Sequence, residues 1–255
     1  MRRSARIQYS LKDGEVIIGS DAHYWPNKPS TAHRAFVALI KEWKPSLVIL
    51  NGDVIDGASI SRHSRIGWES QPTVQEEIEA AQVRLSEIEA VSKSDLVWTL
   101  GNHDARFETR LAEVAPQYAD VKGIHLRDHF PKWRPAWSVE INRSTIIKHR
   151  YKGGVHAAFN NAKDSGRHTV TGHLHSLGVA AYTDYSGTRF GVDGGTLADP
   201  LGPQFSNYTE DNPLNWRSGF VLLTYRQGKL LWPEVIHVIN ERRGEVTFRG
   251  EIFRV

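Results

Sequence analysis

Six short segments of this chain carry side chains that bind metal ions in proteins. Four of them follow or end runs of apolar, β-type residues; Leu47–Leu50 leads into Asp53, and Leu96–Leu100 leads into Asn102. Open α/β sheets place their functional sites at the carboxyl ends of strands. The pattern therefore predicts one polar site assembled from strand ends. The segments hold Asp21 and His23; Asp53 and Asp56; Asn102, His103 and Asp104; His149; His156; and His173 and His175.

The types and spacing of these residues favour two divalent transition-metal ions. Asp21 and His23 stand two residues apart, as do His173 and His175, and side chains two apart at a strand end face the same way. Asp53 has two oxygens and can bridge two ions. Nitrogen and oxygen ligands suit Mn²⁺, Fe, Zn²⁺ or Ni²⁺. Two ions about 3.5–4 Å apart would lower the pKa of a bridging water and clamp the oxygens of an in-line displacement, which is the machinery of phosphate ester hydrolysis.

The composition narrows the possible chemistry further. The 255 residues include no cysteine, which excludes thiolate metal ligands, disulfides and a cysteine nucleophile. No stretch approaches the roughly 20 apolar residues that a membrane span needs, and no apolar run follows the charged segment Met1–Arg6, so we expect no signal peptide and a cytoplasmic protein. The length favours a single domain over residues 1–255. The oligomeric state stays open.

The elements that must position the site can also be predicted. The first hundred residues alternate strands with helices, which is typical of a parallel α/β layer. Thr73 and Glu76 form a capping box that starts the second helix, and His33, on the first helix, is expected at the surface. The expected strands are 16–20, 46–50, 96–100, 137–141, 145–149, 168–171, 179–185, 188–192, 220–226, 230–239 and 246–253, the expected helices are 32–43, 73–91 and 155–163, and 197–217 is a long loop.

Two of the motifs are more specific than the others: Gly101-Asn102-His103-Asp104 and, nearly as specific, Gly172-His173-Leu174-His175. The sequence Gly101-Asn102-His103-Asp104 arises by chance in about one chain of this size in a thousand. With the other motifs in this order, the chain resembles the calcineurin-like metallophosphoesterases, a superfamily of phosphatases, cyclic-nucleotide phosphodiesterases and repair nucleases. The resemblance runs from about Val16 to Gly195. It implies an α/β fold with two packed mixed β-sheets flanked by helices, a four-layer α/β/β/α sandwich.

The resemblance also implies a role for each site residue. His103 would be the catalytic histidine beside the leaving group, with Asp104 orienting it. His149 precedes Arg150 where the superfamily usually has glycine, so His156 is a rival ligand; His149 is favoured because it ends the strand before it. One ion would be held by Asp21, His23, Asp53 and His175, and the other by Asp53, Asn102, His149 and His173.

The residues around the motifs suggest a phosphoester substrate. Arg62, His63 and Arg106 follow the metal-binding strands closely and are expected to contact phosphate. Residues 100–170 hold twelve Lys or Arg against seven Asp or Glu, which is either a solvated face or a surface that steers phosphate. The aromatics of the long loop, Phe205, Tyr208 and Trp216, could stack a nucleobase, but a loop packed on its own aromatics is favoured.

These inferences lead to one preferred function and two alternatives. We expect a hydrolase of phosphodiesters, with nucleic acid such as DNA or a nucleotide as substrate, acting through a metal-bridging hydroxide. A phosphomonoesterase with the same site is one alternative. A non-catalytic metal-bound scaffold, as some members of the superfamily are, is the other. Scaffolds tend to lose the catalytic histidine, so the presence of His103 and Asp104 favours catalysis.

Overall fold

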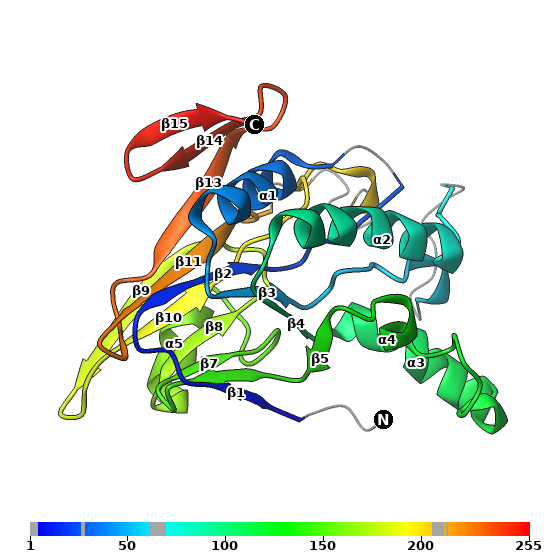
Figure 1. The fold of residues 1–255 in the computed structure, drawn as a ribbon, viewed down its shortest axis with the longest axis horizontal. Coiled ribbons are helices and arrows are strands. Elements are labelled where there is room, and N and C mark those ends of the chain that lie inside the picture. The colour runs from blue at the N-terminus through cyan, green and yellow to red at the C-terminus, as the bar shows by residue number, and fades with distance from the viewer. Residues whose placement is uncertain (1–4, 27–28, 62–69, 206–211, 213) are drawn as a thin grey trace.

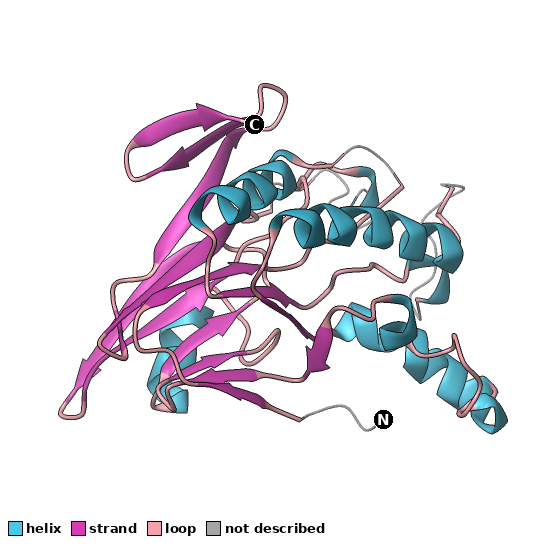
Figure 2. Cartoon of the chain, in the orientation of Figure 1, coloured by secondary structure: helices cyan, strands magenta, loops and turns pink. Residues whose placement is uncertain are grey.

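The chain folds into two β-sheets that pack face to face, with helices on their outer surfaces (Figures 1 and 2). This computed structural model describes residues 5–26, 29–61, 70–205, 212 and 214–255. Arg62, His63 and Tyr208 lie outside the described residues. The predicted fold class, two packed mixed sheets flanked by helices, is confirmed.

The larger sheet carries the parallel strands predicted from the first hundred residues. Its centre is formed by β2 (Gly14–Gly19), β3 (Leu47–Asn51) and β4 (Asp95–Thr99), paired in parallel. The order among the described residues is β15-β14-β13-β11-β2-β3-β4-β5, with β12 beside β11. The remaining bounds are β5 (Arg134–Ala136), β11 (Gly219–Arg226), β12 (Lys229–Leu230), β13 (Glu234–Asn240), β14 (Glu245–Phe248) and β15 (Glu251–Arg254).

The smaller sheet is built from the middle of the chain and the N-terminal strand. Its order among the described residues is β1-β6-β7-β8-β10-β9, and β6 and β7 form the predicted hairpin around Asn142–Ser144. Apolar side chains of the two sheets meet in one core, to which Ile18, Ile49 and Val170 contribute. The strands are β1 (Ile7–Tyr9), β6 (Val139–Ile141), β7 (Thr145–Ile147), β8 (His168–Thr171), β9 (Gly178–Asp184) and β10 (Gly187–Asp193).

Helices cover the outer face of each sheet. Helices α1 (Thr31–Trp43) and α2 (Val74–Val91) bury their apolar stripes in a second core on the larger sheet, and α2 begins with the predicted capping box. Helix α5 (Ala157–Ser165) packs on β8, β9 and β10. The others are α3 (Asn102–Val114) and α4 (Leu126–His129), with short 3₁₀ turns at Ala58–Ile60, Pro116–Tyr118 and Pro203–Phe205. No helix within the described ranges has the length and apolar character that crossing a membrane requires.

Three expectations about these elements were wrong. The strand predicted over 246–253 is the hairpin β14–β15, because Arg249 and Gly250 take left-handed backbone conformations and reverse the chain. The strand predicted over 230–239 is interrupted between β12 and β13, where Pro233 follows Trp232. His33 is buried, not at the surface, since it precedes Phe36 by three residues and so lies on the inner face of α1.

Candidate two-metal site

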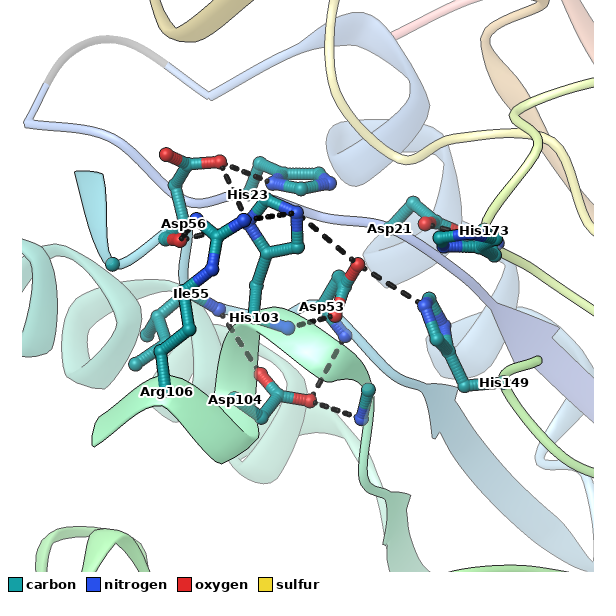
Figure 3. A network of polar contacts seen from close by, with 12 residues as sticks. Asp21, His23, Asp53, Ile55, Asp56, His103, Asp104, Arg106, His149 and His173 are labelled. Atoms are coloured by element: carbon teal, nitrogen blue, oxygen red, sulfur yellow. Dashed lines mark hydrogen bonds and ion pairs between the residues drawn. The ribbon is translucent and has the colours of Figure 1, made fainter. Parts of the chain in front are cut away.

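The predicted metal-binding residues meet at one edge of the two sheets, in the loops that follow the strands (Figure 3). Asp21 and His23 follow β2, and Asp53 follows β3. Asn102 starts α3 just after β4, His149 follows β7, and His173 and His175 follow β8. Both sheets therefore contribute, and the site spans the seam between them.

The backbone at this site is unusual. Asp21, His23 and Asp53 have positive φ angles of 51°, 39° and 51°, and His173 and His175 have 74° and 58°. Five of the ten non-glycine residues with positive φ in the described part of the chain are thus predicted ligands. Asp21 and His23 do reach one group of candidate ligands, as expected, but strand alternation is not the cause because β2 ends at Gly19. The chain has left the strand, and left-handed conformations, which cost about 1–3 kcal/mol each, aim these side chains instead.

Hydrogen bonds between neighbouring loops hold this backbone in place. The N–H of Asp21 donates to Gly52 O at 3.0 Å, and the N–H of His23 donates to Asp53 O at 2.9 Å. The loop after β2 is thus tied to the loop after β3 beyond the last regular strand pair. This continuation offsets the cost of the strained residues and fixes the two loops side by side.

The ligand side chains form two adjacent groups. Asp21, His23 and His175 have candidate ligand atoms within 4.8 Å of one another, and so do Asp53, His149 and His173. The Nε2 atom of His149 lies 3.0 Å from Asp53 Oδ2. Their members agree with the two ligand sets that the resemblance implies, which stay predictions. An overlapping third group joins His23, Asp56 and His103.

Several ligand atoms are buried without a hydrogen-bond partner among the described residues. They are Nε2 of His23 and of His149, Nδ1 of His175 and Oδ1 of Asn102. A buried polar atom without a partner costs about 1–3 kcal/mol, so four of them together require an explanation. A bound cation accepts all four lone pairs, and the donor set therefore fits divalent metal ions.

Hydrogen bonds also orient the imidazoles for metal binding. His149 Nδ1 lies 2.9 Å from the carbonyl oxygen of Asn51, which can only accept, so Nδ1 carries a proton and Nε2 is the nitrogen that faces the site. His23 Nδ1 lies 2.9 Å from Asp56 Oδ1 and leaves Nε2 free in the same way. Such outer partners fix the tautomer and the ring angle of histidine ligands.

The glycines of the motifs allow the ligands to approach one another's backbones. A Cβ on Gly101 would lie 2.0 Å from Asp53 Oδ1, and one on Gly172 would lie 2.4 Å from Asp21 Oδ2. No side chain fits at either position without displacing a ligand carboxylate. Gly101 and Gly172 are therefore required because each packs closely against a ligand carboxylate from another loop.

The contacts of Asp104 differ from the expectation. The Asp104 carboxylate accepts the N–H groups of Asp53 and Val54, both at 2.9 Å, and does not contact the His103 imidazole. Instead, His103 Nδ1 lies 2.8 Å from Asp56 O and 3.1 Å from Asp56 Oδ1. Asp56 thus orients His103, whereas Asp104 holds the Asp53 loop. The physical reason is that consecutive residues on a helix do not face each other, and His103 and Asp104 both lie in the first turn of α3.

One residue that supports the site, Glu77, was not predicted from the sequence. Glu77 on α2 is buried, and its carboxylate accepts the N–H groups of Asp56, Gly57 and Ala58 at 3.0, 2.6 and 3.0 Å. It thereby anchors the loop that presents Asp56 to the two histidines. Glu77 stands four residues before Ala81, so it is a charged residue on the apolar stripe of the helix. This position could have indicated that its side chain is buried.

The charges of the site are strongly coupled. Burial opposes ionisation of Asp53, but His149 and His103 hold the pKa of its carboxyl well below its usual range. Asp53 Oδ1 also accepts the His103 N–H at 2.8 Å, at the positive end of α3. Burial opposes protonation of His149, yet Asp21 and Asp53 raise its pKa to about 10. The carboxylates of Asp21 and Asp53 therefore favour a positive charge at this position.

The other predicted residues lie at different places. Arg106 is beside His103, with Nη2 3.2 Å from its Nε2, and its Nη1 donates to Asp56 O at 3.0 Å. His156 is exposed at the start of α5 and belongs to none of the three groups of possible ligands in the described residues. Phe205 is buried, and its ring centroid lies 5.1 Å from that of His23 and 5.0 Å from that of Trp216. These two aromatics pack on each other, as favoured from the sequence, and they form a wall of the site.

Several solved structures of other proteins are similar to this one. Vacuolar Protein Sorting 29 from Cryptosporidium parvum has a similar structure, with 14% identity, a TM-score of 0.51 and coverage of 96% of this chain and 100% of that chain. Wild-type Vps29 from Entamoeba histolytica complexed with zinc shows 12% identity, 94% and 98% coverage and a TM-score of 0.47. A novel archaeal phosphodiesterase shows 15% identity, 87% and 99% coverage and a TM-score of 0.43. No curated protein sequence matches this chain.

The family comparison is more decisive than these distant structural likenesses. The family model described as calcineurin-like phosphoesterase matches residues 15–186, which is more than half of the chain and includes every predicted ligand. The motifs, the two-sheet fold and this match agree. The chain belongs to the calcineurin-like phosphoesterase family.

Proposed function

We propose that this chain is a two-metal phosphodiesterase that cleaves a phosphodiester bond in nucleic acid or in a nucleotide. The observation that carries the proposal is the pair of adjacent ligand groups with four buried, unpartnered ligand atoms, next to a histidine that is not needed as a ligand. Membership of a phosphoesterase family supports the reaction class. The diester preference rests on the surroundings of the site.

The donor set supports one set of ligands for each ion. Asp53 belongs to the group with His149 and His173 and, having two carboxylate oxygens, would contact both ions. The nitrogen and oxygen donors suit Mn²⁺, Fe, Zn²⁺ or Ni²⁺. When bound, the two ions supply a nucleophilic water at neutral pH and neutralise phosphate charge. Asp21, His23 and His175 would complete one ion, and Asn102, His149 and His173 the other.

His103 is placed to move a proton. Its Nδ1 is engaged by Asp56, and its Nε2 points toward the ligands, 3.8 Å from Asp53 Oδ2. Burial opposes its protonation, but Asp53 and Asp56 raise the pKa of His103 above its ordinary value. Arg106 Nη2 donates to Nε2 at 3.2 Å in this structure; once the guanidinium turns to the phosphate instead, Nε2 would take up a proton and donate it to the leaving oxygen, a contribution of about 10²–10⁴-fold in rate. The Arg106 guanidinium beside it adds positive charge where phosphate charge builds up.

A basic groove next to Asn102 supports a substrate with several phosphates. A depression of about 490 Å³ starts at Asn102 and runs along the exposed side of α3. Arg106, Arg110 and Arg150 line it, while Glu113, the acid in its described lining, is paired with Arg110 at 3.1 Å. A nucleic acid strand brings phosphates next to the cleaved one, and guanidinium groups gain affinity by releasing their counterions. A monoester offers no such neighbours.

A panel of substrates tests this function. We expect the protein with added Mn²⁺ to hydrolyse bis-p-nitrophenyl phosphate and single-stranded oligonucleotides faster than p-nitrophenyl phosphate, with cyclic nucleotides and duplex DNA as further substrates. EDTA should abolish most of the activity, and His103→Ala should abolish most of it toward oligonucleotides with a smaller loss for the nitrophenyl esters, whereas the matched control His156→Ala should keep it. Hydrolysis of monoesters alone would replace the diesterase by a phosphomonoesterase. Metal uptake without any hydrolysis would favour the scaffold.

A further inference from the structure

A second cavity lies on the His23 side of the metal-binding groups. Its volume is about 280 Å³, and Ala22 and His23 form part of its wall. The rest of the wall comes from Tyr24 and Trp25, from α1 and the turn before it, from α2, from the segment around Pro203 and from the residue after β13, Glu241. The cavity therefore borders the metal-binding groups at His23.

Three residues of the cavity wall carry buried polar atoms without a hydrogen-bond partner in the described part of the chain. These atoms are Arg34 Nε, Gln204 Oε1 and Glu241 Oε2. Gln204 is only 8% exposed, so solvent at the open surface does not reach its amide freely. Of the eleven such atoms in the described residues, four belong to the predicted metal ligands and these three share one cavity. Unpaired polar groups that converge on a cavity require a partner with complementary donors and acceptors.

The charges of the cavity wall exclude a free anion as the natural occupant. Arg34 and Arg84 contribute two positive charges, and Asp199 and Glu241 contribute two negative charges. Arg84 Nη1 is in addition bonded to Glu87 Oε1 at 2.6 Å. Since these formal charges cancel, the cavity suits an uncharged group that both donates and accepts hydrogen bonds. In the basic groove beside Asn102, by contrast, the positive charges outnumber the negative one.

The aromatic lining and the volume of the cavity favour a planar ring. Tyr24 and Trp25 provide aromatic surface on its wall. The Tyr24 hydroxyl is bonded to His33 Nδ1 at 2.9 Å, and His33 Nε2 is bonded to Glu87 Oε2 at 2.7 Å, so this part of the wall is held in place. The volume lies just below the range of about 300–1,000 Å³ that is usual for small-molecule pockets. It admits one ring system and excludes a folded polymer segment.

We propose that this cavity binds the nucleobase of the nucleotide whose phosphate lies at the metal-binding residues. The link to that phosphate rests on the proposed function. Gln204 Oε1 and Glu241 Oε2 accept hydrogen bonds from the base edge, and Arg34 Nε donates to it. Enzymes that act on nucleotides read bases in this way, by hydrogen bonds to the edge and contact with aromatic faces.

Calorimetric titration of the full chain in EDTA tests the proposal without metal or turnover. Adenosine, guanosine, cytidine and thymidine are the probes, with free ribose and inorganic phosphate for comparison. We expect at least one nucleoside to bind saturably at submillimolar concentration, and ribose and phosphate not to compete with it. Gln204→Leu should weaken this binding about tenfold, as expected for loss of one hydrogen bond to a buried group. The matched control Gln75→Leu, on the exposed side of α2, should bind as the unaltered chain does.

Three results would overturn the assignment: no nucleoside binding to the unaltered chain, displacement of the nucleoside by phosphate, or equal affinity in Gln204→Leu. If Gln204→Leu does not fold, Arg34→Lys, which keeps the charge and removes Nε, must show the weakened binding. Hydrolysis of bis-p-nitrophenyl phosphate without nucleoside binding refutes the cavity and leaves the proposed function intact. Nucleoside binding without hydrolysis of any phosphoester refutes the proposed function and leaves the cavity.

Discussion

Replacing Asp104 separates its structural role from the chemistry of His103. The carboxylate accepts four N–H groups at 2.8–2.9 Å: those of Asp53, Val54 and Gly101 and the Trp98 indole. All are buried. Each donor left unpaired costs about 1–3 kcal/mol, so Asp104→Ala should lose roughly 4–12 kcal/mol, comparable with the whole stability of a domain of about 5–15 kcal/mol. We expect this variant not to fold.

Asp104→Asn is the informative variant because it keeps the size of the side chain. The amide oxygen can still serve the donors at Asp53, Gly101 and Trp98, which share Oδ2, but the NH₂ group then faces the N–H of Val54 and, at 3.4 Å, that of Ile55. The strong bond to Val54 and the long one to Ile55 are both lost, so the free energy of unfolding should fall by at least about 1–3 kcal/mol. Because the Asp53 loop loosens, metal affinity should fall by about 10–100-fold.

Urea unfolding and metal titration measure these two effects. Asp120→Asn, an exposed carboxylate, is the matched control and should change stability by less than about 0.5 kcal/mol. With saturating metal, the Asp104→Asn protein should show the same dependence of rate on the leaving group as the unaltered chain. Unchanged stability and metal affinity, with a leaving-group dependence like that of His103→Ala, would mean that Asp104 acts through His103 and would refute this reasoning.

Four further outcomes follow from the site. Asp53→Asn should lose at least one of two bound ions and all turnover, as metal analysis of the purified variant will show; two full equivalents with normal activity would contradict its bridging role. His103→Ala should keep both ions and lose about 10²–10⁴ in kcat, less for nitrophenyl esters because their leaving group needs no proton. Gly101→Ala, whose Cβ would lie 2.0 Å from Asp53 Oδ1, should bind metal poorly, whereas Gly153→Ala, with no atom within 4 Å of its Cβ, should bind normally. Oligonucleotide binding in EDTA should weaken steeply with salt, and Arg150→Ala should reduce the slope by about one; a flat salt dependence would mean that the groove is ordinary solvated surface.

The strands and the ligands could be predicted because their signals are local. Apolar runs such as Leu47–Leu50 identify buried strands, and the carboxyl ends of parallel strands meet at one edge. Helix α3 could not be predicted in the same way, because among its thirteen residues few are apolar and Phe107 is its one buried hydrophobic residue. Its start is set partly from outside, by Asp53, which accepts the N–H of His103, and partly by its own Asp104, which accepts the N–H of Gly101.

The conformation and the partners of the ligands depend on contacts across the chain. The left-handed backbone at Asp21 and His23 is maintained by hydrogen bonds to the loop after β3, and no residue type near them indicates it. The choice between Asp56 and Asp104 as partner of His103 also depends on the path of that loop. Adjacency in the sequence favours Asp104, whereas the geometry brings Asp56, which lies 47 residues away, to the imidazole.

Anomalous scattering from crystals grown with Mn²⁺ tests the central claim most directly. The account predicts two peaks per chain, one contacted by Asp21, His23 and His175 and the other by Asn102, His149 and His173, with Asp53 contacting both. The third group of possible ligands, His23, Asp56 and His103, should hold no ion, because His103 must remain free to donate a proton. A single peak, or a peak between Asp56 and His103, would contradict the two-metal assignment.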